Sequence, residues 1–466
     1  MTHVLVIGAY GSAGVAAATD LAEDPAVDRL TLVDDGDPGG GLCILRGCMP
    51  SKELLSAAAH RFQVRHDDRL EGDPSLAVET VIDTKDEHIE NFAAHRRGAV
   101  NRLADREDVE FLTESASFVG DRTVAVGDRV FEPDYVILAT GSSISLPDLP
   151  GMDSVDPMTS ADVLEARELP DSGVVMGFGV VGMELVPYLR EAGDVDLTVI
   201  EHDDRPLDDA DDAFGDAILD IYRGAFGIDV VTNAHEQSIA RTEDGDVRLT
   251  VEHRDGATEA LEAEQLFAFT GRRPALDGLD LNAAGLDPGS GWVRNTMQAR
   301  DDDRIFVVGD ANGREPILHV AKEEGFLAAE NIGNHLAGEP LREYTNTYHR
   351  VVFSGAGVYP YARVGHSAAS AAAAGLDVEV VTREASQDGV FKTKAAPEGL
   401  ARLVVDADDG TVLGYQGLHY HADVMAKTMQ VIIENELPVQ SVPDRAYHPT
   451  TPEIIDGLLS AAGEAV

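Results

Sequence analysis

The stretch Val4–Gly14, VLVIGAYGSAG, decides the fold. Its apolar start predicts a strand, and the small residues of Val15–Ala22 after the glycines predict a helix. Leu30–Val33 is expected to be the next strand, with Asp34 at its end. Glycines in such a turn let the backbone approach a pyrophosphate at the helix N-terminus, and the acid accepts the ribose hydroxyls. The unit predicts a dinucleotide site at Gly8, Gly11, Gly14 and Asp34.

The spacing of these glycines differs from the usual G-x-G-x-x-G. Gly8, Gly11 and Gly14 indicate one inserted residue, which we assign to Tyr10. An unaltered motif follows later in the chain, where GFGVVG carries Gly177, Gly179 and Gly182. It is preceded by an expected strand, Gly173–Met176, and followed by a helix to Ala192, a strand Leu197–Ile200 and Glu201.

Two such units predict two bound dinucleotides, one of which can be a flavin. An acid at the end of the second strand usually favours NAD over NADP, because it repels a 2′-phosphate. Glu201 is that acid in the second unit, and His202 and Arg205 beside it offer charge that can offset the repulsion. The choice between NADH and NADPH is therefore open on this evidence.

The stretch Gly39–Lys52, GGGLCILRGCMPSK, holds the only two cysteines of the chain, Cys43 and Cys48. A helix is expected from Pro50 to about His66, with the proline in its first turn. A cysteine at a helix N-terminus has its thiolate stabilised by the unpaired N–H groups and the helix dipole. We therefore expect Cys48 to be the stabilised anion and Cys43, on a glycine-rich loop, the more exposed partner.

A redox-active pair is the preferred interpretation of the two cysteines, against a structural staple or part of a zinc site. A loop this short would stabilise the fold by only about 2 kcal/mol in the chain-entropy model. Structural zinc needs further ligands at close spacing, and the chain has no third cysteine. No metal site is expected.

The chain is strongly acidic, with 84 Asp and Glu against 36 Lys and Arg and a net charge of −48. Such a surface repels nucleic acid and anionic membranes, so neither is expected as a partner. High salt makes it tolerable, because the screening length falls to about 3 Å at molar ionic strength. The composition is typical of a halophilic cytoplasmic protein. The opening MTHVLVIG is read as a strand, not a signal peptide, and no apolar run is long enough for a membrane span.

The remainder of the chain predicts alternating helices and strands. Residues 68–110 are helix-like, short strands are expected within Ser115–Val130, and Tyr135–Ala139 and Arg304–Asp310 are expected as buried strands. Composition shifts predict boundaries near Pro147–Thr159 and Glu339–Pro340. The expected fold is α/β, with two Rossmann-like dinucleotide-binding domains and a C-terminal α+β domain. We divide the chain into 1–145, 146–272, 273–338 and 339–466, and the resemblance described next implies for them the roles of FAD-binding domain (first part), NAD(P)-binding domain, FAD/central domain (second part) and interface (dimerisation) domain.

Several motifs occur in an order that resembles the class I pyridine nucleotide–disulfide oxidoreductases, the family of glutathione reductase and dihydrolipoamide dehydrogenase. They are GGGLCILRGCMPSK, GVVGME, TGRRP, FVVGDANG with ILHVAKEEG, and HPTTPE, and they span essentially the whole chain. The segment between the cysteines departs from the family pattern at Leu45 and Arg46. That departure alters the substrate-facing loop.

The resemblance implies roles for further residues. It implies a Lys52–Glu184 ion pair near the flavin, Cys48 against the flavin, Cys43 exchanging with substrate, and an acid–base pair, His448 with Glu453, that comes from the partner subunit of a homodimer. The residues implied to hold FAD are Asp34, Thr140, Gly141, Gly309 and Asp310, with Ala116 and His319 as lesser contacts. The nicotinamide cofactor is implied at Gly177, Gly179, Gly182 and Glu201, flanked by His202 and Arg205.

The expected activity is electron transfer from NAD(P)H through FAD and the Cys43–Cys48 disulfide to a small disulfide. The absence of further cysteines argues against mercuric reductase and against the large thioredoxin reductases. Resemblance and salt adaptation favour bis-γ-glutamylcystine reduction with NADPH, with NADH not excluded because of Glu201, and with dihydrolipoamide dehydrogenase as the alternative. A non-catalytic flavoprotein is disfavoured. Arg46, Arg61 and Arg65 are candidate contacts for substrate carboxylates.

Overall fold

The computed structural model describes residues 1–443, 445 and 447–466. The chain divides into two compact units, each assembled from three segments of the sequence. The first unit comprises Met1–Pro50, Thr84–Ser145 and Arg272–Asn346, and the second comprises Ser51–Asp83, Leu146–Gly271 and Thr347–Val466. The four-part domain division given above stays a prediction.

The first unit is built on a five-stranded parallel sheet in the order β18-β7-β1-β2-β3. Its strands are β1 (His3–Ile7), β2 (Arg29–Val33), β3 (Val109–Leu112), β7 (Tyr135–Leu138) and β18 (Ile305–Val307). The central strand β1 is apolar almost throughout because a parallel sheet is covered on both faces. The carboxyl ends of β1, β2 and β7 therefore meet at one edge, where the first glycine turn begins.

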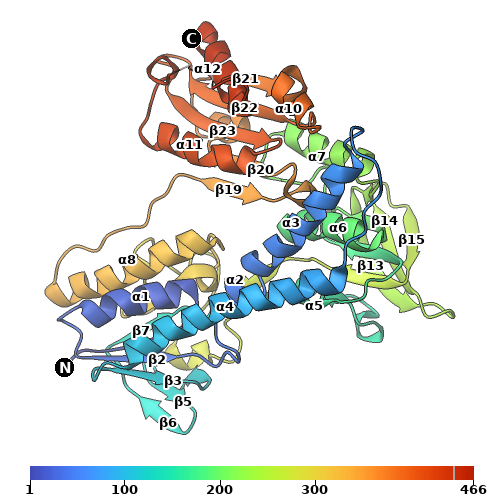
Figure 1. Cartoon of the computed structure of the whole chain (residues 1–466). Coiled ribbons are helices and arrows are strands. Elements are labelled where there is room, and N and C mark those ends of the chain that lie inside the picture. The colour runs from blue at the N-terminus through green and yellow to red at the C-terminus, as the bar shows by residue number, and fades with distance from the viewer. Residues whose placement is uncertain (444, 446) are drawn as a thin grey trace. The chain divides into compact units, whose positions relative to one another are not determined.

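The two faces of this sheet pack against different elements. Val4 and Val6 belong to a buried apolar cluster with α1 (Ser12–Glu23), α8 (Leu318–Ala337) and α4 (Val78–Ala104). Figure 1 shows α1 and α8 side by side, and the two helices are in contact. Leu5 and Ile7 point to the opposite face, into a cluster with the strands β4 (Ala116–Phe118), β5 (Val124–Val126) and β6 (Arg129–Phe131). A two-stranded ribbon pairs β8 (Ser142–Ile144) with β17 (Arg272–Pro274).

The second unit contains another five-stranded parallel sheet, in the order β12-β11-β10-β16-β9. Its strands are β9 (Met158–Thr159), β10 (Ser172–Met176), β11 (Asp196–Ile200), β12 (Asp229–Val231) and β16 (Gln265–Ala268). The helices of this part are α5 (Ser160–Glu165), α6 (Val180–Gly193) and α7 (Asp212–Gly224). An antiparallel sheet is formed by β13 (Ala234–Arg241), β14 (Val247–His253) and β15 (Thr258–Ala263).

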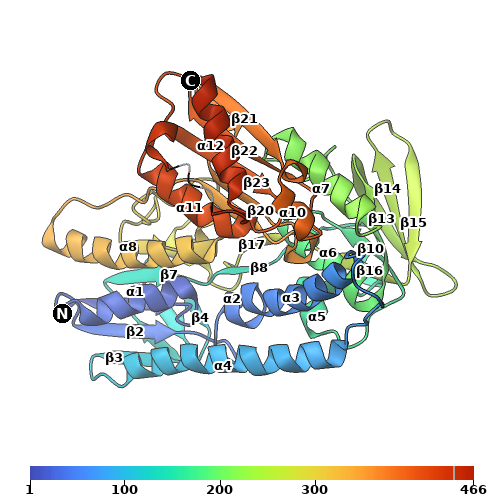
Figure 2. The same ribbon diagram turned by 45° about the horizontal axis from the view of Figure 1, so that its top comes forward.

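The C-terminal part of the second unit is an antiparallel sheet in the order β19-β20-β23-β22-β21. Its strands are β19 (His349–Val352), β20 (Tyr361–Gly365), β21 (Val378–Glu384), β22 (Leu400–Asp406) and β23 (Val412–Leu418). Its helices are α9 (Ala368–Ala373), α10 (Gly389–Thr393), α11 (Ala422–Glu434) and α12 (Glu453–Ala465). Figure 2 shows α11 and α12 lying on this sheet, where they share one buried apolar cluster with it.

The predicted α/β fold with two parallel nucleotide-type sheets and a C-terminal α+β part is confirmed. Two local expectations near the cysteines are corrected. The long helix α3 (Cys48–Arg65) starts at Cys48 itself, and Cys43 lies in a short helix, α2 (Leu42–Leu45), not in a loop. A proline is tolerated anywhere in the first helical turn, so Pro50 does not mark the first residue. Among the described residues, no helix has the length and apolar character needed to span a bilayer.

Candidate functional site

The first glycine turn joins β1 to α1 and has no room for side chains. Gly8 has φ of +95°, and a Cβ there would lie 2.3 Å from the carbonyl oxygen of Ala139. A Cβ on Gly14 would lie 2.1 Å from the carbonyl oxygen of Gly8. Gly11 is the N-cap of α1, whose first turn contains no acidic residue and no side-chain cap. The turn therefore leaves the N–H groups of a helix N-terminus free for an anion.

Tyr10 is the extra residue of this turn, and its main chain is fully used. Its N–H donates to Oδ2 of Asp34 at 2.8 Å, and its carbonyl accepts from Nη1 of Arg96 at 2.8 Å. The buried ring packs edge-on to Phe111, with centroids 5.3 Å apart, and a Cβ on Gly39 would collide with it. The inserted Tyr10 is thus held by Asp34 after β2, by Arg96 of α4 and by Gly39 of the loop that leads to the cysteines.

Asp310 sits on a short 3-10 helix, Gly309–Asn312, directly after β18. Oγ of Ser142 donates to Oδ2 of Asp310 at 2.6 Å, and Nε of Arg272 donates to Oγ of Ser142 at 2.9 Å. Arg272 also donates to the carbonyl of Ser142 at 2.6 Å. This chain of hydrogen bonds fixes the carboxylate of Asp310, and neither Ser142 nor Arg272 was singled out by the sequence motifs as a site residue.

Glu324 of α8 holds the same 3-10 helix from inside the unit. Its Oε2 accepts from the N–H of Gly309 at 2.7 Å and from Nδ2 of Asn312 at 2.8 Å. The side chain is 1% exposed, and burial raises its pKa to about 7. A buried carboxyl with these two donors positions Gly309 and the Asp310 that follows. Glu324 lies within the sequence ILHVAKEEG, but nothing in that pattern distinguishes Glu324 from the neighbouring Glu323.

The other residues implied to hold FAD lie in the first unit as well. Thr140 and Gly141 follow β7, Ala116 begins β4, and His319 is the exposed second residue of α8. Oγ1 of Thr140 is buried and has no protein partner among the described residues. An orphaned hydroxyl, a glycine turn closed to side chains and an uncapped helix N-terminus fit a bound dinucleotide, so the residues present fit FAD.

The cysteines are free thiols that contact each other. The Cys43 thiol hydrogen-bonds Cys48, and this bond, followed by burial, raises its pKa well above the usual range, while the charge of Arg96 opposes the shift. Cys48 begins α3, as a stabilised thiolate requires. The expectation that Cys43 is the more exposed residue is wrong: Cys43 is half-buried in α2, and Cys48 is exposed. The turn of α2 buries Cys43, which a loop would not do.

Lys52 and Glu184 form a close ion pair within the second unit. Nζ of Lys52 lies 2.7 Å from Oε2 of Glu184, and the side chains are 32% and 12% exposed. Oε1 of Glu184 accepts from the N–H of Phe353 at 3.2 Å, and the Lys52 ammonium stands 4.4 Å from the centre of the Phe353 ring. The structure therefore brings together the two residues that the resemblance paired. Their placement beside a flavin stays a prediction.

The second glycine turn, between β10 and α6, has the same geometry as the first with one residue fewer. Gly177 has φ of +96°, and a Cβ there would lie 2.6 Å from the carbonyl oxygen of Phe269. A Cβ on Gly182 would lie 2.3 Å from the carbonyl oxygen of Gly177. Gly179 is the N-cap of α6, with open space around it. Glu201 follows β11, and Oε1 accepts from the N–H of Asp203 at 3.0 Å.

The two basic side chains beside Glu201, Arg205 and His202, already lie against acids. Arg205 lies 2.6 Å from Asp216, 2.7 Å from Asp204 and 3.8 Å from Asp212. His202 lies 2.5 Å from Glu236. A 2′-phosphate at this site would have to compete with these carboxylates for each cation, and it would meet Glu201 as well.

His448 and Glu453 are adjacent in the structure. Nδ1 of His448 lies 3.1 Å from Oε2 of Glu453, and the N–H of Thr450 donates to Oε1 at 2.7 Å. The bond to His448 lowers the pKa of Glu453. Glu453 is the first residue of α12, and His448 is 77% exposed. A carboxylate that orients an exposed imidazole matches the geometry of an acid–base pair.

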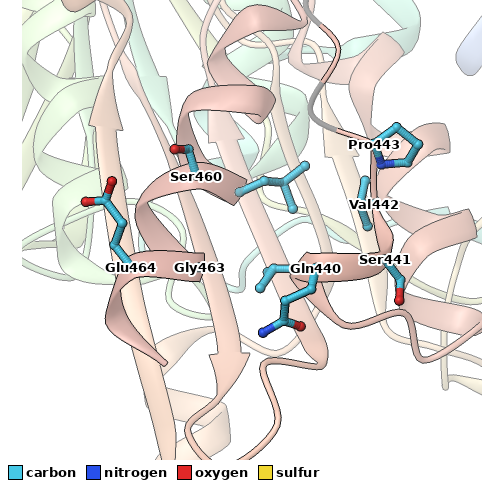
Figure 3. A pocket seen from close by; sticks show the side chains of 9 residues that line it. Gln440, Ser441, Val442, Pro443, Ser460, Gly463 and Glu464 are labelled. Atoms are coloured by element: carbon cyan, nitrogen blue, oxygen red, sulfur yellow. The ribbon is translucent and has the colours of Figure 1, made fainter.

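A pocket in the second unit lies at the other end of α12. Figure 3 shows it between the 3-10 helix Val439–Ser441 with the residues after it and the C-terminal half of α12. It contains none of the residues singled out by the sequence. Its lining residues are Val439, Gln440, Ser441, Val442, Pro443, Leu459, Ser460, Gly463 and Glu464. Over the described ranges, no group of three or more His, Cys, Asp or Glu is arranged to hold a metal.

Two of the three arginines proposed for substrate carboxylates are engaged elsewhere. Arg61 is 5% exposed and lies 3.0 Å from Asp194, and Arg65 lies 3.0 Å from the buried Glu191. Both guanidinium groups belong to an ion-pair network inside the second unit, and the assignment of the buried Arg61 to substrate is wrong. The assignment of Arg65, which is 28% exposed, stays a prediction. Arg46 is exposed on the segment between the cysteines.

Comparison with protein families gives a match over most of the chain. Residues 2–325 match the model described as pyridine nucleotide-disulphide oxidoreductase, and residues 350–458 match the dimerisation domain of the same family.

Among curated proteins, the dihydrolipoyl dehydrogenase of Halobacterium salinarum is 31% identical, covering 100% of this chain and 97% of that protein. The dihydrolipoyl dehydrogenase of Haloferax volcanii is 30% identical with the same coverage. A mercuric reductase of Bacillus cereus is 29% identical over 88% of this chain and 63% of that protein.

Solved structures share the fold. A Cu(II) complex of the HOCl-induced flavoprotein disulfide reductase RclA from Escherichia coli has a TM-score of 0.82 at 24% identity, covering 98% of this chain and 99% of that chain. LpdA from Mycobacterium tuberculosis has a TM-score of 0.82 at 22% identity, covering 99% of both chains. The family uses FAD and a pyridine nucleotide. From the matched family models and the full-length relatives, the chain belongs to the pyridine nucleotide–disulphide oxidoreductases and is an FAD-dependent enzyme of that family.

Proposed function

We propose that this enzyme reduces a small anionic disulfide through Cys43 and Cys48, with bis-γ-glutamylcystine as the substrate. The observation that carries the proposal is the hydrogen-bonded cysteine pair at the start of α3. Bound FAD would pass electrons from the reduced nicotinamide to the Cys43–Cys48 disulfide. We place this reaction in the cytoplasm, where a reduced dithiol persists.

The residues of the chain account for the thiol chemistry that follows. The thiolate of Cys43 attacks one sulfur of the substrate, which forms a mixed disulfide and releases one thiolate. Cys48 then attacks Cys43, which restores the Cys43–Cys48 disulfide and releases the second thiol. Because the pKa of Cys43 is raised, its thiol needs a base before it can attack. We assign that base, and the acid that protonates the leaving thiolate, to His448 oriented by Glu453. The enzyme is proposed to be a homodimer in which His448 serves the neighbouring subunit.

The anionic character of the substrate is inferred from the cysteine loop. The whole chain carries a charge of −48, which disfavours a small anion almost everywhere on its surface. The segment between the cysteines carries one charged residue, the exposed Arg46, and no acid. A disulfide with several carboxylates gains from this cation, whereas lipoamide does not. Replacing Arg46 with Ala should raise KM for bis-γ-glutamylcystine and leave KM for lipoamide unchanged.

The coenzyme is proposed to be NADH. The expectation of NADPH requires Arg205 and His202 to offset the charge of Glu201, and both lie against carboxylates. Glu201 remains to accept the ribose hydroxyls that NADH retains. This geometry favours NADH, and with it a second candidate activity, dihydrolipoyl dehydrogenase, which is the name of the two haloarchaeal relatives described above.

Steady-state turnover of the FAD-loaded enzyme at molar potassium chloride tests these assignments. Bis-γ-glutamylcystine, oxidised glutathione and lipoamide are each assayed with NADH and NADPH. We expect the highest kcat/KM for bis-γ-glutamylcystine with NADH, and Cys43→Ser should abolish turnover while the flavin stays reducible by nicotinamide. Preference for lipoamide would move the enzyme to the second candidate. Absence of turnover with all three disulfides would refute the reductase assignment.

A further inference from the structure

Arg96 of α4 is a half-buried cation at the first glycine turn, and it has no acidic partner among the described residues. Its Nη1 donates to the carbonyl of Tyr10 at 2.8 Å, and its Nη2 lies 3.5 Å from Oγ of Ser12. Over the part of the chain that the structure describes, no carboxylate lies within ion-pair distance of its guanidinium, although the neighbouring Arg97 pairs with Glu90 at 2.5 Å. This is unexpected in a chain with 84 acidic and 36 basic residues.

Arg96 lies beside the N-terminus of α1, and the ionisable Cys43 acts on its charge. Ser12 is the first residue of α1, where the helix dipole and the free N–H groups place positive charge. The first turn of α1 contains no acidic residue that would balance it. Burial lowers the pKa of Arg96, so its charge is held at some cost in free energy. A guanidinium beside a helix N-terminus is stable when an anion lies between them.

We propose that Arg96 binds the diphosphate of FAD together with the N-terminus of α1, and that its bond to Tyr10 holds the inserted residue clear of that anion. The inference rests on the proposed function only in taking FAD as the bound flavin. Arginine matches phosphate oxygens with paired N–H donors, which lysine does not. One of those donors bonds the Tyr10 carbonyl and another makes a long contact of 3.5 Å to Oγ of Ser12, which leaves the remaining N–H groups for the anion.

The second turn offers a contrast inside the same molecule. Gly177, Gly179 and Gly182 form a turn of ordinary length, and α6 likewise lacks an acid in its first turn. Within the described ranges, no arginine bonds to the residues of that turn. Arg96 therefore accompanies the insertion, and its role is specific to the flavin side.

Competition of ADP and adenosine with FAD measures how much Arg96 contributes to binding the diphosphate. Apoprotein is loaded with FAD at constant potassium chloride, and ADP and adenosine compete for the site while flavin fluorescence is followed. ADP carries the diphosphate and adenosine does not, so the ratio of their inhibition constants isolates the anion contact. Arg96→Gln should weaken the binding of ADP about 10- to 100-fold. The inhibition constant of adenosine should stay within about two-fold of its wild-type value. Equal weakening of both ligands, or of neither, would overturn the proposal.

Two further variants separate charge from structure. Arg97→Gln removes the adjacent arginine, which donates to the carbonyl of Gly39 at 3.2 Å, and should leave the ratio unchanged. Arg96→Lys keeps the charge without the paired donors, so its preference for ADP should lie between those of wild type and Arg96→Gln, and it decides the question if Arg96→Gln does not fold. A lysine variant that prefers ADP no more than the glutamine variant would overturn the charge contribution that the proposal requires. A wild-type enzyme that reduces no disulfide yet shows the Arg96-dependent ratio would refute the proposed function alone.

Discussion

The two glycine turns of this chain share the same close backbone contacts but differ in length by one residue. Gly8 and Gly177 have φ of +95° and +96°, and Gly14 and Gly182 approach the carbonyl oxygen of the first glycine equally closely. Between these fixed points the first turn carries one more residue, Tyr10. The closest backbone contacts are kept, and the extra residue is placed where side-chain and main-chain partners can hold it.

The difference lies in what holds each acid. Asp34 accepts two N–H bonds, from Tyr10 at 2.8 Å and from Gly36 at 2.9 Å, so the inserted residue itself orients the acid. Glu201 accepts from the N–H of Asp203 at 3.0 Å and lies among carboxylates that occupy Arg205 and His202. The acid of the first turn is oriented by the backbone of that turn, whereas the acid of the second turn lies among other charged groups.

The largest expected effect comes from closing either turn. Gly14→Ala places a Cβ 2.1 Å from a carbonyl oxygen, and Gly182→Ala places one at 2.3 Å. Overpacking of this kind costs about 1–3 kcal/mol or more. Gly14→Ala should purify with little FAD, whereas Gly182→Ala should keep FAD and lose reduction by nicotinamide, as absorbance at the flavin band shows.

The control for these two variants is Gly224→Ala, at the end of α7. No atom lies within 4 Å of a Cβ there, and φ is not positive. FAD content and flavin reduction should match the wild type. Loss of FAD in Gly182→Ala as complete as in Gly14→Ala would mean that the two turns do not serve separate ligands.

A second test uses the buried acid of the flavin side. The pKa of Glu324 is raised to about 7 by burial, above its unfolded value, so the folded state binds a proton that the unfolded state has lost between about pH 4.5 and 7. The contribution of Glu324 to the free energy of unfolding therefore falls as the pH rises from about 4.5 to 7 and is constant at higher pH. Glu324→Gln removes the dependence and should be more stable than wild type by about 3 kcal/mol at pH 8 and by little at pH 5.

Unfolding by urea at pH 5, 6, 7 and 8, at one ionic strength, measures this difference. Glu323→Gln, on the exposed neighbour, is the matched control. A difference in the free energy of unfolding between Glu324→Gln and wild type that does not change with pH would show that Glu324 is ionised from pH 5 to pH 8.

Sequence motifs predicted most of what these tests address, because they depend on short-range spacing. The turns, both acids and the cysteine pair were identified from local patterns, and the resemblance to the family paired Lys52 with Glu184. Residues that act through tertiary contact were not: Arg96, Ser142, Arg272 and Glu324 lie on elements distant in sequence from what they hold. Arg61 was misassigned for the same reason, since its helix position does not reveal the acid Asp194 that meets it.

A third test compares the two acids. Asp34→Ser leaves the N–H groups of Tyr10 and Gly36 without an acceptor and should weaken FAD binding about tenfold or more. Glu201→Ser removes a charge that opposes a 2′-phosphate, so it should lower kcat/KM with NADH and raise the NADPH to NADH ratio about tenfold. FAD affinity and coenzyme preference are measured for both variants. A change of coenzyme preference in Asp34→Ser would contradict the separation of the two sites.

The smallest expected effect is that of Tyr10→Phe, and it shows which part of the inserted residue acts. The bonds of Tyr10 to Asp34 and Arg96 use its N–H and its carbonyl, and its ring packs on Phe111, so the hydroxyl contributes to none of them. FAD affinity of the phenylalanine variant should stay within about two-fold of wild type. Tyr10→Pro keeps the length of the turn but removes the N–H, leaving Asp34 with one donor. If the backbone carries the effect, proline releases FAD and phenylalanine does not, and the reverse order would assign the role to the hydroxyl.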